Sequence, residues 1–208
     1  MKKLLFLFDL DSTVTTKEIL PTISQKLGKE EEMRDLTEKT MLGEIPFKQS
    51  FLERIEILKD IPVSEVQDLI EKIPVNEKLV KFMNDNKDRC FIVTGNLDVW
   101  IKKLIKKIGM ENNCYCSNAL VLNDRIVDVP KVIDKSLVVD EINSDFVAVG
   151  DGNNDAEMIS KAKIGIGFGG VRTIAPAVLE CASHAVYTED KLVDFLETIL
   201  AKEEKYDK

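Results

Sequence analysis

The sequence contains a single histidine, His184, and only four cysteines. A zinc site of the Cys/His type requires several such ligands at short spacings, and the chain has no C-x-x-C pair, so we expect no zinc site. His184 lies in a short apolar run, which indicates a structural role and leaves no histidine for Ser–His–Asp chemistry. We interpret the cysteines as free thiols in a reducing cytoplasm.

Long hydrophobic segments are also missing from the sequence. The apolar run in MKKLLFLF ends at Asp9, too early for a signal peptide, and no segment is long enough to span a membrane. The 37 acidic residues outnumber the 29 basic ones, and the formal net charge of −8 disfavours binding to nucleic-acid phosphates. We therefore expect a soluble, cytoplasmic protein that binds neither nucleic acid nor membranes. Nothing in the sequence indicates an oligomeric state.

Short apolar runs, each followed by a loop and a helical pattern, recur along the chain. They occupy residues 3–8, 90–93, 146–149 and 164–168. Such runs are typical of strands buried on both faces of a parallel sheet, and the strand–loop–helix repetition predicts an α/β fold. Two β-rich arms on either side of Asn123 and Asp124 predict a hairpin.

The segment 15–75 differs from the rest, because its pattern is helical with no convincing strand. We predict a Rossmann-like parallel-sheet core formed by residues 1–14 and 76–208. A helical-bundle cap formed by residues 15–75 is expected to be inserted after the first strand.

Acidic residues directly follow two of the predicted strands. Asp9 and Asp11 stand in FDLDST after the first strand, and Asp151 and Asp155 stand in GDGNND after the strand at 146–149. Either motif alone is compatible with a solvated loop or a helix cap. Together they supply acids to one crevice, because ligands of open α/β sheets bind at the carboxyl ends of the strands. Close carboxylates repel one another, and a divalent cation would relieve that repulsion. Mg²⁺ suits such a site, because it binds carboxylates together with water and the oxygens of a substrate phosphate.

Three further candidates could bind an anion. The segment VTGN offers the hydroxyl of Thr94 and the amide of Gly95 at the end of a strand, a suitable place for phosphate. Lys131 and Lys135 both precede the strand that leads to Asp151, and we favour Lys135 because a helix is predicted to begin there. Arg54 lies within an apolar helical stripe formed by Phe47, Phe51, Ile55 and Leu58. A charge in that position either extends to solvent or meets an anion.

These motifs, in this order and over nearly the whole chain, resemble those of the haloacid dehalogenase superfamily of phosphatases. The resemblance implies a magnesium-dependent phosphohydrolase in which Asp9 is the nucleophile that forms an aspartyl-phosphate. It implies that Asp11 protonates the leaving oxygen and later deprotonates water. It further implies that Thr94 and Lys135 contact the phosphate. Asp151 would hold Mg²⁺ together with the Asp9 carboxylate and the Asp11 backbone carbonyl, and Asp155 would complete that site.

Within this superfamily, the segment MLGEIPFKQSFLERIEILKDIP is most similar to the cap of the phosphoserine phosphatases. By this similarity the substrate-binding positions are Glu18, Met41, Phe47, Arg54, Gly95 and Asn154. The implied reaction is the dephosphorylation of phosphoserine to serine, as in serine biosynthesis. The loop GFGGVRT departs from the common pattern of the family, and Arg172 in this loop could make a contact that the family pattern does not predict. Phosphotransfer to another alcohol, hydrolysis of a different small phosphometabolite and a non-catalytic binding protein remain as alternatives.

Overall fold

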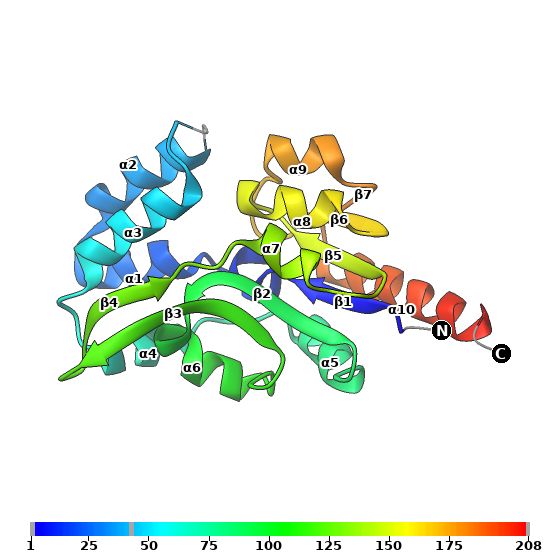
Figure 1. Ribbon diagram of the computed structural model, residues 1–208, viewed down its shortest axis with the longest axis horizontal. Helices are drawn as coiled ribbons and strands as arrows, with labels where there is room; N and C mark the ends of the chain where they lie inside the picture. The colour runs from blue at the N-terminus through cyan, green and yellow to red at the C-terminus, as the bar shows by residue number, and fades with distance from the viewer. Residues whose placement is uncertain (1–2, 42–43, 207–208) are drawn as a thin grey trace.

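The computed structural model of the chain describes residues 3–41 and 44–206. Its centre is a seven-stranded sheet with the order β4-β3-β2-β1-β5-β6-β7 (Figure 1). The strands are β1 (Leu5–Phe8), β2 (Cys90–Leu97), β3 (Cys114–Leu122), β4 (Arg125–Lys131), β5 (Phe146–Gly150), β6 (Ile164–Phe168) and β7 (His184–Val186). Neighbouring strands are parallel, except that β4 runs antiparallel to β3. The predicted α/β fold with a mostly parallel sheet is confirmed.

The helices that pack on this sheet form two layers (Figure 1). They are α5 (Glu77–Asp85), α6 (Asp98–Lys107) and α10 (Glu189–Tyr206) on one face, and α7 (Lys135–Asp140), α8 (Ala156–Ser160) and α9 (Pro176–Cys181) on the other. Strand β1 shows why both faces are covered, since side chains alternate along a strand. Phe6 contacts Phe82 of α5 with ring centroids 5.5 Å apart, whereas Leu7 joins the cluster of Met158 and Val178 on the opposite face.

Four helices are inserted between β1 and β2. They are α1 (Ile19–Leu27), α2 (Glu30–Met41), α3 (Phe47–Leu58) and α4 (Val63–Ile70). The two ends of the insertion lie side by side, because Thr16 N donates to Pro74 O at 2.9 Å and Asn76 N donates to Val14 O at 2.8 Å. Helices α1, α2 and α3 form a lobe beside the carboxyl ends of the strands, while α4 packs against α6 (Figure 1). We propose that the insertion is the cap of residues 15–75.

The predicted hairpin is present between β3 and β4. Asn123 and Asp124 have φ values of 50° and 61°, the left-handed pair that a tight two-residue turn requires. The Asp124 carboxylate also accepts a hydrogen bond from Ser64 N at 3.0 Å at the start of α4, so the turn is connected to the insertion.

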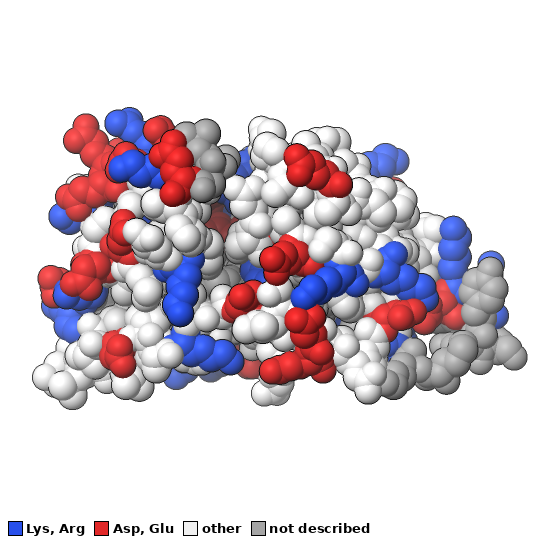
Figure 2. All heavy atoms as spheres, turned by 45° about the horizontal axis from the view of Figure 1, so that its top comes forward, with Lys and Arg blue, Asp and Glu red and all other residues white. Residues whose placement is uncertain are grey.

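The surface combines both signs of charge. Figure 2 shows acidic and basic side chains interspersed on the face that it presents, and not gathered into one patch. Within the described residues, no helix is both long enough and apolar enough to cross a membrane.

Candidate active site

A sharp loop after β1 positions the first two acids. Asp9 N donates to Val149 O at 2.9 Å, which extends the β1–β5 pairing by one residue. The chain then turns tightly through Leu10–Val14, where Ser12 has a φ of 61°, an uncommon value for a residue other than glycine. After this turn the Asp11 carboxylate accepts a hydrogen bond from Ile19 N at 2.9 Å, at the start of α1. The turn therefore holds both carboxylates at the carboxyl edge of the sheet.

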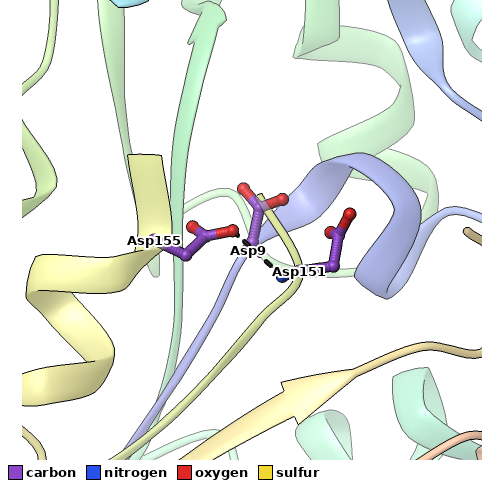
Figure 3. A group of neighbouring side chains, drawn as sticks. All are labelled: Asp9, Asp151 and Asp155. Carbon is purple, nitrogen blue, oxygen red and sulfur yellow. Dashed lines mark hydrogen bonds between the residues drawn. The ribbon is translucent and has the colours of Figure 1, made fainter. Parts of the chain in front are cut away.

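Three acids converge at this edge. Carboxylate oxygens of Asp9, Asp151 and Asp155 lie within 4.8 Å of one another, and Figure 3 shows the three side chains grouped at the ends of their elements. Asp155 is oriented by the backbone, because its Oδ2 accepts from Asp151 N at 3.1 Å and from Gly152 N at 2.9 Å. A Cβ on residue 150 would lie 2.5 Å from the Asp155 carboxyl carbon, so Gly150 leaves the room that this arrangement needs.

Burial of these acids makes their charges costly. Asp9 is 5% exposed, and Asp151 and Asp155 are 0% exposed. Burial and the neighbouring acids raise the pKa of Asp9 to about 7. Burial likewise raises the pKa of Asp151 to about 7, against the opposing charge of Arg172. A buried group of three carboxylates is a donor set of the kind that Mg²⁺ prefers, and the residues present fit that ion.

One lysine neutralises part of this cluster. Lys135, the first residue of α7, is 3% exposed and donates to Asp9 Oδ1 and, at 2.5 Å, to Asp155 Oδ1. Burial lowers the pKa of Lys135, but the two carboxylates outweigh that effect and raise it overall. Lys131, the alternative that the sequence offered, is an exposed residue at the end of β4. The structure thus brings only Lys135 of the two to the acids.

The end of β2 forms the neighbouring wall. Thr94 Oγ1 accepts from Asn96 N at 3.2 Å and from Asn96 Nδ2 at 3.1 Å, and Gly95 O accepts from Ser117 Oγ at 2.7 Å. The strand β2 continues to Leu97, and α6 begins directly after it at Asp98, so a helix follows this motif. The pairing of β2 with β3 shifts register between Val93 and Leu97, and this irregular stretch carries the motif.

A cavity of about 760 Å³ separates these loops from the inserted helices. Phe47, at the start of α3, closes one side, because its ring lies 2.5 Å from the place where residue 95 would carry a Cβ. Gly95 is therefore required for this close approach. The Phe47 ring stacks on Phe51 with centroids 5.7 Å apart, which ties the wall to the core of the lobe.

Arg54 presents its charge to the same cavity. Its Nη2 donates to Thr40 Oγ1 at 3.3 Å, while its Nε is buried without a hydrogen-bond partner among the described residues. Burial lowers the pKa of Arg54, and the charges of Asp11 and Glu18 oppose that shift. The side chain of Met41, another predicted substrate contact, lies outside the described residues.

Glu18 and Asn154 also line the cavity, but Glu18 is already paired. Arg172 Nη1 donates to Glu18 Oε1 at 2.5 Å, and Arg172 Nε donates to Asp151 Oδ2. Thr13, which sequence reasoning did not single out, donates to Asp151 Oδ1 at 3.4 Å. The sequence feature that could have predicted a role for Arg172 is its position in the loop after β6. That loop lies at the edge of the sheet where the other functional loops begin.

Comparison with known proteins agrees with this geometry. A family model described as haloacid dehalogenase-like hydrolase matches residues 4–163. The chain belongs to the haloacid dehalogenase-like hydrolases. The prediction of an enzyme is thereby confirmed, and the alternative of a non-catalytic binding protein is not supported.

Similar proteins include a phosphoserine phosphatase of Methanocaldococcus jannaschii, 33% identical over 181 residues that cover 80% of this chain and 86% of that protein. A substrate-bound phosphoserine phosphatase complex superposes with a TM-score of 0.78 at 27% identity, covering 95% of this chain and 99% of that one. A phospho-aspartyl intermediate analogue of a phosphoserine phosphatase gives a TM-score of 0.76 at 28% identity, over 94% of this chain and 99% of that one.

In this hydrolase, Lys135→Ala is expected to lower kcat/KM at least about 100-fold, a typical loss for one preorganised electrostatic contact. Lys131→Ala, a matched change four residues away, should alter kcat/KM less than about twofold, as expected for an exposed residue outside the site. Steady-state kinetics of both variants, with circular dichroism to verify folding, make the comparison. A larger loss for the folded Lys131 variant would move the role to that residue.

Proposed function

We propose that this hydrolase removes the phosphate of phosphoserine through an aspartyl-phosphate on Asp9. The main support for phosphoserine as the substrate comes from Arg54. Its half-buried guanidinium lies on the cavity wall, and its Nε has no hydrogen-bond partner among the described residues. An unsatisfied buried donor is costly, and a planar guanidinium suits a carboxylate held by parallel hydrogen bonds. Asp9, Asp11 and Arg54 line one cavity, so a small phosphate ester with a carboxylate can meet the acids and the arginine together.

The proposed chemistry begins with Asp9. Its carboxylate oxygen attacks phosphorus, the bond between phosphorus and the serine oxygen breaks, and Asp11 gives its proton to that oxygen. Burial and the charge of Asp9 raise the pKa of Asp11 to about 7, so the protonated form is available near neutral pH. In the second step a water attacks the same phosphorus, Asp11 takes its proton, and the bond between phosphorus and Asp9 breaks to release inorganic phosphate.

Other residues assist both displacements. Mg²⁺, held by Asp9, Asp151 and Asp155 with the backbone carbonyl of Asp11, would supply positive charge for the phosphate and for the nucleophile. Lys135 adds a fixed cation beside Asp9, and the β2 motif with Thr94 and Gly95 binds phosphate oxygens. Phe47 excludes water from the cavity. A cytoplasmic location is part of this proposal, supported by the free thiols of all four cysteines.

The test compares two substrates. Arg54→Ala is expected to lower kcat/KM for phosphoserine by about 30-fold or more, since breaking a buried charged pair costs about 2–5 kcal/mol and each 1.36 kcal/mol is about tenfold in rate. Hydrolysis of p-nitrophenyl phosphate, which has no carboxylate, should barely change. The measurement is the ratio of the two kcat/KM values in variant and wild type.

Arg34→Ala is the matched control, because Arg34 is an exposed arginine on α2 of the same lobe. It should leave both substrates unaffected. An equal loss for phosphoserine and p-nitrophenyl phosphate in Arg54→Ala would make Arg54 a structural or phosphate-binding residue and would remove the main support for phosphoserine.

A further inference from the structure

Arg172 connects two parts of the molecule that lie far apart in sequence. It stands in the loop between β6 and α9, and its side chain is 30% exposed. Nε donates to Asp151 at the acid cluster, and Nη1 donates to Glu18 Oε1 at 2.5 Å. Glu18 is the residue directly before α1, so one guanidinium joins the cluster to the start of the inserted segment.

The contact with Asp151 uses the same carboxylate that the cluster offers to a cation. Asp151 Oδ1 accepts from Thr13 and Oδ2 accepts from Arg172, so both oxygens of this fully buried carboxylate already have donors. Asp9 and Asp155 share Lys135 in a similar way. A divalent ion that binds the three acids competes with these donors for the lone pairs of Asp151, and it also meets the repulsion of the guanidinium charge.

The second partner gives Arg172 a place to remain when it leaves Asp151. Glu18 is 28% exposed at its side chain and lies on the cavity wall. A guanidinium has several donors in a fixed fork, and a lysine ammonium in its place could not span both acids in the same planar geometry. The guanidinium can therefore release Asp151 and still donate a hydrogen bond to Glu18, so it does not become unpaired.

We propose that Arg172 is a positioning residue: it is the counter-cation of Asp151, it competes there with Mg²⁺, and it releases Asp151 but stays paired with Glu18 when the ion binds. Metal binding is thereby coupled to the contact between Arg172 and Glu18. This role rests on the proposed function only in taking the acid cluster as the metal site.

The test measures Mn²⁺ binding by electron paramagnetic resonance of the free ion, with no substrate present. Arg172→Gln is expected to tighten Mn²⁺ binding at least about fivefold, the lower end of typical coupling between two ligands. Arg172→Lys keeps the charge, so its Mn²⁺ affinity should stay below that of Arg172→Gln. Arg34→Gln, the same change on the exposed surface of α2, should leave the affinity unchanged. Unchanged or weaker Mn²⁺ binding by Arg172→Gln would overturn the proposal.

A double-mutant cycle with Glu18→Gln tests the coupling. In the wild-type background the loss of Glu18 leaves Asp151 as the remaining acid partner of Arg172, so Mn²⁺ binding should weaken more than in the Arg172→Gln background. Additive effects would show that Glu18 does not help Arg172 to release Asp151. Because Mn²⁺ binding is read without substrate, a protein that binds Mn²⁺ as expected and fails to release phosphate from phosphoserine contradicts the proposed function and not the role of Arg172.

Discussion

Asp9→Asn is expected to abolish turnover of phosphoserine, with a loss of at least about 10⁴-fold in kcat, as is typical when a covalent nucleophile is removed. The amide has nearly the size of the carboxylate but no charge with which to attack phosphorus. Asp9 is buried between β1 and the loop after β5, and burial together with the nearby acids raises its pKa to about 7. Since its surroundings disfavour the ionised form, a neutral amide should not lower the melting temperature.

The measurement is phosphate release under saturating phosphoserine and Mg²⁺, together with a thermal melt. Asp35→Asn, the same change at an exposed position on α2, serves as the control and should keep full activity. Mass spectrometry of the intact Asp9→Asn variant checks that the introduced amide has not hydrolysed back to the carboxylate. Near-wild-type turnover by an undeamidated sample would show that Asp9 is not the nucleophile.

The second large effect is expected for Asp11→Asn. This change should slow both the formation and the hydrolysis of the phosphoenzyme by about 10²–10⁴-fold, the usual contribution of a general acid–base group. The amide oxygen can still accept the hydrogen bond that Ile19 N donates to Asp11 at 2.9 Å, so the loop should keep its shape. The loss would then report the missing proton transfer and not a displaced Asp9.

A good leaving group separates the two steps. Nitrophenolate departs without a proton, so with p-nitrophenyl phosphate the Asp11→Asn variant should form the phosphoenzyme readily and then hydrolyse it slowly. Stopped-flow absorbance should show a burst of nitrophenolate about equal to the enzyme concentration, followed by a slow steady state. With phosphoserine no burst of serine is expected. A loss of less than about fivefold in both steps would assign the acid–base role to another group.

Several features of this protein follow from local sequence pattern alone. A strand buried on both faces needs a continuous apolar run, so β1, β5 and β6 could be placed within one or two residues. Parallel strands end at a common edge, so Asp9 and Asp151 could be expected to meet without any knowledge of side-chain positions. The hairpin at Asn123 and Asp124 also follows from local preference, because both residues tolerate a positive φ.

The tertiary structure decided the contacts that join distant loops. Lys131 and Lys135 lie four positions apart, and only the helix predicted to begin at Lys135 favoured that residue in the sequence. In the fold, Lys131 ends the edge strand β4, whereas Lys135 begins α7 and contacts Asp9 and Asp155. The pairing of Arg172 with Glu18 spans 154 positions and carries no local signature. Apolar periodicity reports burial, which is a local average, whereas the partner of a buried charge depends on which loops the packed sheet brings within hydrogen-bond distance. For that reason the sequence alone was sufficient for the sheet, its acidic edge and a preference for Lys135, whereas the contacts of Lys135 and Arg172 with that edge were decided by the fold.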